Sequence, residues 1–216
     1  MSDWSQLSEL NLPIINDAAQ SIESHNGITA SASNGLISCL SFSPSKTISS
    51  WGSGGALLTD VDEYAEMARR LRLHGKLSNN NTACSSGLNS MLSSFEAACI
   101  LVGLDYSEQW QKRRTEIANY LIDVSHYKSG MDAGLAKHTY HKLVFQSENR
   151  NEIIDNFAEK NIDCAIHYNL TVNDEPLYNT NTDLFKSDRL KNISFTVPNQ
   201  HSLTDEEVKQ IAEVIS

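Results

Sequence analysis

The stretch that decides the fold is "GLISCLSFSPSKTISSWGSGGALLTD", which runs from Gly35 to Asp60. It contains two short apolar runs, Gly35–Ser43 and Gly55–Asp60, separated by a loop of small residues that carries a single lysine, Lys46. Neither run alternates cleanly between apolar and polar residues, which is typical of strands covered on both faces. The stretch therefore predicts two strands of an α/β sheet, joined by a loop with one amine.

A third strand is predicted upstream, at Leu12–Asp17, where a short apolar run begins near a proline and stops at a carboxylate. Open α/β sheets bind their ligands beyond the carboxyl ends of the strands. Asp17 and Ser41 lie at such ends, and Lys46 follows in the next loop. A lone loop lysine is usually solvated and a lone aspartate after a strand is usually a turn former. These residues are therefore candidates only as a set.

Two helices are expected to follow these strands. The first is predicted to begin with a capping box of Asp60 and Glu63 and to end at Gly75. The second begins at a similar pair, Ser93 and Glu96, and is expected to be divided into two helices at Gly103 and the polar residues after it.

The pattern changes near residue 128, and the remainder predicts a smaller α/β unit. A closing helix is expected after Thr204, with Glu207 completing its capping box. The other predicted elements are the strands Thr139–Phe145, Ile162–Tyr168 and Asn192–Pro198 and the short helix Asn151–Asn161. We therefore expect a domain at residues 1–127 and a small C-terminal domain at residues 128–216.

Composition excludes several classes of function. The formal net charge of -10 repels phosphodiester backbones and anionic lipid surfaces, so neither nucleic acid nor a membrane is an expected partner. The four cysteines are scattered and form no CxxC pair, which favours core positions and a reducing compartment. The first residues resemble no signal peptide, and no apolar run has membrane-spanning length. A cytoplasmic location is expected, with no metal site.

Several segments together resemble one protein family. "INDAAQS" at Ile15–Ser21 is followed by "SFSPSK" and "GSGGALLTD" within Ser41–Asp60, and then by "LRLHG" and "GLNSMLSSFEAA". This combination is similar to the pyridoxal-phosphate-dependent sugar aminotransferases of the DegT/StrS group, and the likeness continues to "SLTDEEV" near the end. The resemblance implies an α/β fold: part of an aspartate-aminotransferase-like large domain of fold type I, plus a small C-terminal α/β domain.

The resemblance also implies roles for individual residues. Lys46 matches the catalytic lysine that binds the aldehyde of pyridoxal 5'-phosphate. Asp17 would pair with the pyridinium nitrogen, Gln20 would bond near the ring hydroxyl, and Ser41 would donate to the phosphate. Asn89 matches an asparagine that reaches the phosphate of a neighbouring subunit, which implies a homodimer.

The resemblance has limits in substrate contacts and in length. Met91 stands where the family usually has arginine, and the loop after His167 lacks a second histidine, so His167 is a weak substrate-site candidate beside its reading as a structural histidine. Roughly the first two fifths of the family's length, about one small domain, has no counterpart here. That part carries the main phosphate cradle and the aromatic residue that stacks on the cofactor.

Two functions from different classes are therefore expected. The first is an aminotransferase, or a fragment of one, that moves an amino group from glutamate or glutamine to a nucleotide-linked keto sugar in sugar or polysaccharide biosynthesis. It would act as a homodimer or with a chain that supplies the missing N-terminal part. The alternative is a non-catalytic truncated homologue that acts as a dimerisation or interaction partner.

Overall fold

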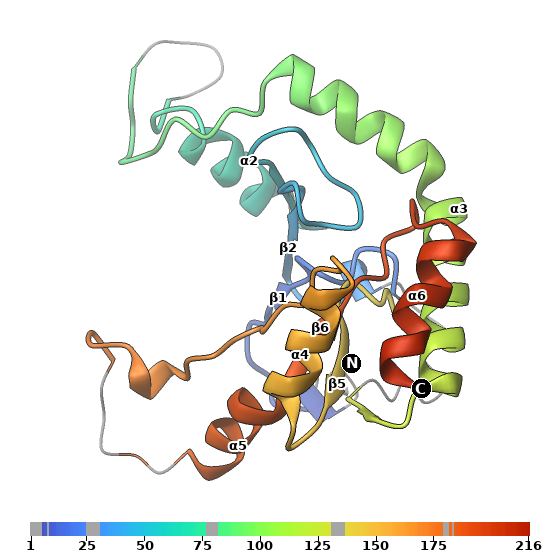
Figure 1. Ribbon diagram of the computed structural model, residues 1–216. Coiled ribbons are helices and arrows are strands. Elements are labelled where there is room, and N and C mark those ends of the chain that lie inside the picture. The colour runs from blue at the N-terminus through green and yellow to red at the C-terminus, as the bar shows by residue number, and fades with distance from the viewer. Residues whose placement is uncertain are drawn as a thin grey trace. The chain divides into compact units, whose positions relative to one another are not determined.

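The computed structural model describes residues 6–7, 9–24, 31–76, 82–130, 137–178, 182 and 184–216. The chain forms two compact units (Figure 1). Unit 1 comprises Met1–Gln111 and Ala133–Thr139, and unit 2 comprises Lys112–Asp132 and Tyr140–Ser216. Residues 131–136, close to the expected domain boundary, lie outside the described residues. A compact unit is not by itself a domain, so the expected domain boundary after residue 127 stays a prediction.

A three-stranded sheet forms the centre of unit 1 (Figure 1). Its strands are β1 (Ile15–Asp17), β2 (Ile37–Ser41) and β3 (Gly55–Leu58), in that order across the sheet. β1 and β2 run parallel, with Asp17 beside Cys39, and β2 and β3 run antiparallel. The three predicted strands are therefore present, each shorter than expected. A short 3-10 helix, η1 (Ser31–Ser33), precedes β2.

The two faces of this sheet differ in burial. Asn16 and Ser38 point to one face, are both buried, and share a hydrogen bond from Asn16 Nδ2 to Ser38 Oγ of 3.0 Å. Leu40 and Ala56 lie on the same face and pack against a small core of Phe42, Ile48 and Ile100. Side chains alternate along a strand, so Ile15, Asp17 and Ser41 point to the opposite face. Ile15 is 71% exposed there, and Leu57 of β3 on the same face is 43% exposed. The expectation of coverage on both faces therefore does not hold for β3.

Helix α2 (Asp62–Leu71) follows β3, but it does not begin as expected. The predicted capping box of Asp60 and Glu63 was wrong: Val61 occupies the N-cap position and no side chain caps the helix. Thr59 explains the difference, because its hydroxyl donates to Leu36 O at 2.9 Å and accepts from Val61 N at 3.2 Å. The turn before the helix is thus built on Thr59, and Asp60 lies outside the helix. The helix also ends at Leu71 rather than at Gly75.

Helix α3 (Ser94–Val124) is continuous over 31 residues, so the prediction that it would be divided at Gly103 was wrong. A Cβ added at Gly103 would lie 3.1 Å from Ile48 Cγ2, and the glycine therefore permits close packing instead of breaking the helix. The start was predicted correctly: Glu96 N donates to Ser93 Oγ, and Glu96 Oε2 accepts from Ser93 N at 3.1 Å.

Unit 2 has its own antiparallel sheet and core. Its strands are β4 (Lys128–Ser129), β5 (Leu143–Gln146) and β6 (Ser194–Val197), with β5 in the middle. Its helices are α4 (Arg150–Glu159), α5 (Phe185–Ile193) and α6 (Asp205–Ile215), and η2 (Val172–Asp174) is a 3-10 helix. The core includes the fully buried rings of Phe145, Phe157 and Phe195 together with Leu121 and Ile211.

Three strand predictions in unit 2 were wrong: one strand is not present, and two begin later than predicted. Ile162–Tyr168 is not a strand: only Ala165 pairs with β6, through Thr196, because the Ile162 amide donates to Phe157 O in the turn that ends α4. The strand predicted from Thr139 begins later, at Leu143, because Tyr140 has a φ of 48°. The strand predicted from Asn192 begins at Ser194, since α5 continues to Ile193.

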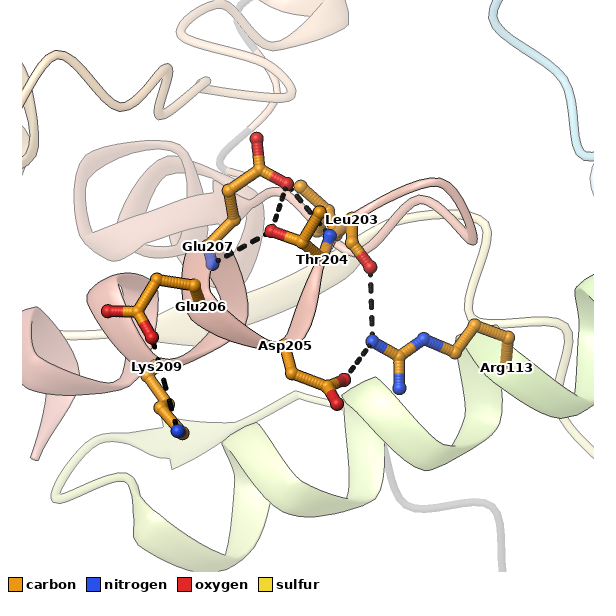
Figure 2. Close-up of polar contacts among 7 residues, drawn as sticks. All are labelled: Arg113, Leu203, Thr204, Asp205, Glu206, Glu207 and Lys209. Atoms are coloured by element: carbon orange, nitrogen blue, oxygen red, sulfur yellow. Dashed lines mark hydrogen bonds and ion pairs between the residues drawn. The ribbon is translucent and has the colours of Figure 1, made fainter.

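The start of α6 is as predicted (Figure 2). Glu207 N donates to Thr204 Oγ1 at 3.2 Å, and Glu207 Oε2 accepts from Thr204 N and Oγ1, both at 2.8 Å. The same turn is joined to α3 by Arg113, whose Nη2 donates to Leu203 O at 3.0 Å and to Asp205 Oδ1 at 2.6 Å. Four apolar residues of the helix are buried: Val208, Ile211, Ala212 and Ile215.

Thr204→Ala is expected to lower the free energy of unfolding of unit 2 by about 1 kcal/mol, the usual cost of losing an N-cap side chain. Bonds from Thr204 also lower the pKa of Glu207 from 4.5. A lowered folded pKa gives stability that is present above the unfolded value and is lost as the pH falls through the folded value. In urea denaturation, the loss of unfolding free energy caused by Thr204→Ala should therefore be smaller at acid pH. Ser202→Ala, which alters an exposed hydroxyl of the same turn, is the control, and an equal loss in both variants contradicts the account.

Candidate functional site

The loop that carries Lys46 is closed by hydrogen bonds at its base. Phe42 N donates to Gly54 O at 2.8 Å, and Ser50 N donates to Phe42 O at 2.7 Å. The buried Ser50 hydroxyl contacts Phe42 O at 2.9 Å and Gly52 O at 2.6 Å. Sequence reasoning missed Ser50, because serine in a serine-rich loop carries no distinguishing signal.

Buried neighbours hold the backbone of Lys46 on both sides. Phe42 and Ile48 both belong to the small core of unit 1, and Lys46 lies between them in sequence. Lys46 N donates to Ser43 O at 2.9 Å, which makes a turn, while the lysine side chain is half-buried. Among the described residues, Lys46 forms no ion pair with a carboxylate.

Asp17 and Ser41 lie at the carboxyl ends of neighbouring parallel strands. Asp17 is beside Cys39, and Ser41 follows two residues further along β2, so both side chains lie on the same, open face. Asp17 Oδ1 accepts from Ala19 N at 3.1 Å, which leaves the other carboxylate oxygen at an exposed position. Ser41 Oγ lies 3.4 Å from both the amide and the hydroxyl of Ser43. The structure thus brings these two predicted residues to one edge of one sheet.

Gln20 lies just beyond Asp17 in the turn that follows β1. Its side chain is exposed, and its carbonyl accepts a hydrogen bond of 2.8 Å from Thr139 Oγ1. Ala18 before it is buried, and its amide donates to Cys39 O at 2.9 Å. Hydrogen bonds at Ala18 and Gln20 therefore fix the backbone of the turn that follows Asp17.

Asn89 lies on an arm formed by residues 71–76 and 82–90. Asn89 is opposite Leu73 in an antiparallel bridge, and its side chain is exposed. Two glycines make the arm possible: Gly75 has a φ of 71°, and a Cβ added to Gly87 would lie 2.1 Å from Gly75 N. Sequence reasoning identified Gly75 only as a helix end, because the contact with Gly87 spans a dozen residues.

His167 belongs to unit 2 and is described there alone. Its Nδ1 lies 3.1 Å from Thr196 Oγ1 on β6. Burial, followed by the charge of Lys142, lowers the pKa of His167 below 6.5, which favours the neutral ring at physiological pH. Both features fit a structural histidine as well as a ligand contact.

Among the described residues, His, Cys, Asp and Glu side chains do not gather in a group of three or more that could hold a metal ion. In the same residues, no helix has both the length and the apolar character needed to cross a bilayer.

Comparison with solved structures identifies the class of fold. The chain matches the crystal structure of a DegT DnrJ EryC1 StrS aminotransferase from Brucella abortus with a TM-score of 0.93 and 24% sequence identity, over 100% of this chain and 60% of that one. The fold is thus a part of an aminotransferase fold, and the predicted fold class is confirmed. In sequence, residues 1–216 match the DegT/DnrJ/EryC1/StrS aminotransferase family, and the chain belongs to this family.

Two curated relatives are each 28% identical in sequence to this chain over the matched residues. UDP-2-acetamido-2-deoxy-3-oxo-D-glucuronate aminotransferase of Pseudomonas aeruginosa is 28% identical over 174 residues, which cover 78% of this chain and 48% of that protein. dTDP-3-amino-3,4,6-trideoxy-alpha-D-glucose transaminase of Streptomyces venezuelae is 28% identical over 192 residues, 82% of this chain and 48% of that protein. The chain spans about half the length of these relatives. The individual roles expected for its site residues stay predictions.

Ser50→Ala is expected to destabilise unit 1, because it leaves the base of the Lys46 loop without a hydroxyl that contacts two carbonyls. Loss of a buried hydrogen-bonding partner costs about 1–3 kcal/mol. Urea denaturation of the variant should show a lower midpoint than wild type. Ser53→Ala, an exposed serine in the same loop, is the control. Equal midpoints for Ser50→Ala and Ser53→Ala would mean that the base of the loop is held in another way.

Proposed function

We propose that this chain forms the lysine-bearing part of a pyridoxal-phosphate-dependent aminotransferase. Its substrates would be a nucleotide-linked keto sugar and an amino donor, glutamate or glutamine. One observation carries the proposal: Asp17 and Ser41 share the open face and the carboxyl edge of parallel strands, and the loop with Lys46 begins directly after Ser41. Family membership supports it.

The residues at this edge suit pyridoxal phosphate chemically. When bound, the cofactor supplies an aldehyde and a ring that accepts electrons. The edge offers a half-buried amine on Lys46, an exposed carboxylate on Asp17 and a hydroxyl on Ser41 that already lies in a turn. An amine, a carboxylate and a hydroxyl are the groups needed for an aldehyde, a ring nitrogen and a phosphate.

Each residue would then have a distinct task. Lys46 Nζ would first accept a proton from the substrate carbon and later release it. Acceptance of the proton requires a neutral amine. Asp17 would hold a proton on the ring nitrogen, and Ser41 would donate to the phosphate. Gln20, in the fixed turn after Asp17, would bond near the ring hydroxyl.

The substrate class is inferred from relatives. The Pseudomonas aeruginosa protein is named for a UDP-linked 3-oxo sugar, and the Streptomyces venezuelae protein for a dTDP-linked amino sugar. The two names share a nucleotide-linked sugar. An amino sugar forms when an amino group replaces a keto oxygen, so a nucleotide-linked keto sugar is proposed as the substrate, and such biosynthesis would take place in the cytoplasm. His167 is proposed as a contact to this substrate, with its neutral ring available as a hydrogen-bond partner.

A homodimer is proposed on the exposed apolar surface of unit 1. Trp51 is 83% exposed and contacts the exposed ring of Phe95 edge to face, with the ring centroids 6.3 Å apart. Leu88, beside Asn89, and Leu101 on α3 are also exposed. Monomeric proteins rarely leave so many large apolar side chains in water. A second copy would cover them, and Asn89 would then reach the partner's phosphate.

The alternative is a non-catalytic interaction partner. The relatives do not favour it, since they are named as an aminotransferase and a transaminase. Such a chain has no need of a reactive Lys46, so the labelling of this lysine separates the two functions.

Labelling of Lys46 is the first test. The purified chain is incubated with pyridoxal phosphate, reduced with borohydride, digested and analysed by mass spectrometry. We expect the label on Lys46 ahead of the other lysines, and a visible absorbance band that Lys46→Ala abolishes and Lys76→Ala retains. Uniform labelling of lysines, or none at saturating cofactor, would leave the non-catalytic function as the better account.

The dimer is tested by Phe95→Arg. A buried charge in an interface is strongly unfavourable, so sedimentation should show a dimer for the wild type and a monomer for this variant. Phe185→Arg, on α5 of unit 2 and exposed to a similar degree, is the matched control and should remain dimeric. Dissociation of both variants, or of neither, argues against this surface.

A further inference from the structure

The sheet of unit 2 has a core face and an outer face. Leu143 and Phe145 of β5 belong to the core, and side chains alternate along a strand, so Val144 between them points to the outer face. Thr196 of β6 is paired with Val144, and Ala165 is paired with Thr196 across the other edge of β6. Paired residues share a face, so Val144, Thr196 and Ala165 form a row on the outer face.

Two polar side chains flank this row. Lys142 comes two residues before Val144, so the same alternation puts it on the outer face. His167 comes two residues after Ala165, and its Nδ1 lies 3.1 Å from Thr196 Oγ1. Burial and then the charge of Lys142 lower the pKa of His167, so the ammonium group lies within electrostatic reach of the ring.

The spacing across the row leaves room for a small group. β5 and the segment with Ala165 lie on opposite sides of β6, two strand spacings or about 10 Å apart. The long side chain of Lys142 and the ring of His167 approach each other over this gap. A ligand held between them would lie above Thr196.

The charge of Lys142 is not used within the described part of the chain. Lys142 forms no ion pair there, although the whole chain carries a net charge of -10. Asp163, which is exposed two residues before Ala165, does not take this lysine as a partner. A half-buried ammonium group beside an imidazole is therefore available to an anion from outside the chain.

We propose that Lys142, His167 and Thr196 form a binding site in unit 2 for the carboxylate of a small-molecule ligand. The hydroxyl of Thr196 would donate to His167 Nδ1 and so keep the ring proton on Nε2. His167 Nε2 and Lys142 Nζ would then donate to the two carboxylate oxygens. Charge-assisted bonds of this kind are the stronger ones in proteins.

A carboxylate suits this site better than a nucleotide diphosphate does. The site offers one full positive charge, on Lys142, since the lowered pKa of His167 favours its neutral ring at physiological pH. One carboxylate balances that charge, whereas a diphosphate would bring further negative charge without a partner, which is unfavourable at a partly buried position.

The inference deepens the proposed function, and its choice of ligands rests on that function. Two ligands of an aminotransferase acting on sugars can carry a carboxylate: glutamate as the amino donor, and a sugar that is a uronic acid. Binding of a carboxylate in unit 2 needs neither pyridoxal phosphate nor Lys46. It can therefore be tested separately from the labelling of Lys46.

The experiment follows the ring signals of His167 by NMR in the intact chain, with isotope-labelled histidine and without pyridoxal phosphate. Acetate and acetamide are the matched probes, because they have the same shape and differ in charge, and the ionic strength is held constant with chloride. We expect acetate to shift the His167 signals to saturation and acetamide to bind at least about tenfold more weakly, the loss usual for a hydrogen-bonded charge.

Further titrations distinguish the two sources of the carboxylate. One arm uses glutamate. The other uses UDP-glucuronate, with UDP-glucose as its control, because the two differ only in the carboxylate. The arm that shifts the His167 signals at the lower concentration identifies the ligand that the site takes.

Variants assign the contacts. Lys142→Met keeps most of the side chain, removes its charge and should weaken acetate binding about tenfold, whereas Lys142→Arg should bind. Lys186→Met, an exposed lysine on α5, is the control and should bind as wild type does. Thr196→Val keeps the shape of a buried side chain. It should weaken binding and change the ring nitrogen shifts of His167, because its proton is no longer kept on Nε2.

Three outcomes overturn the proposal. Equal shifts with acetate and acetamide, or equal weakening by Lys142→Met and Lys186→Met, would leave His167 as a structural histidine. UDP-glucose binding as tightly as UDP-glucuronate, and only with Lys142 present, would assign the site to phosphate instead. Carboxylate binding together with an unlabelled Lys46 would retain this site and reject the aminotransferase function. A labelled Lys46 without carboxylate binding would reject this site alone.

Discussion

The parallel pairing of β1 with β2 is the constraint on which the candidate site depends. It sets Asp17 beside Cys39, and the alternation of side chains then puts Asp17 and Ser41 on the same face. A shift of one residue in this register would turn Asp17 to the buried face, where an unpaired carboxylate is strongly unfavourable. The buried hydrogen bond between Asn16 and Ser38 on the other face opposes that shift, since it would be lost.

Lys46 depends on a different constraint, the packing of its loop. A loop rich in serine and glycine has little preference of its own, and its conformation must be imposed by neighbours. Phe42 and Ile48 provide this by entering the core on either side of the lysine, and Ser50 ties the two ends of the loop together. The amine is thus presented by a rigid base although the surrounding sequence is permissive.

Local signals allowed the most reliable predictions. The capping boxes at Ser93 and Thr204 depend on residues three apart, and both are present. Predictions failed where a distant residue decides the outcome. Thr59 is bonded to Leu36 and displaces the start of α2, and the packing of Gly103 against Ile48 keeps α3 whole. The Ile162 amide is used by α4, and the apolar run Ile162–Tyr168 pairs with the sheet only at Ala165.

The candidate site shows the same difference between features that local sequence decides and features that distant residues decide. The types of its residues and their order are local and could be found from the sequence, including Lys46 after Ser41. The exposure of these residues could not be found from the sequence, because burial depends on what covers the sheet. Asp17 lies on a face with exposed Ile15 and Leu57, while Asn16 and Ser38 on the other face are buried. A carboxylate in water makes weak bonds and one in an enclosed site makes strong ones. The strength of the hydrogen bonds that Asp17 can make therefore depends on what lies against this face more than on any residue within β1.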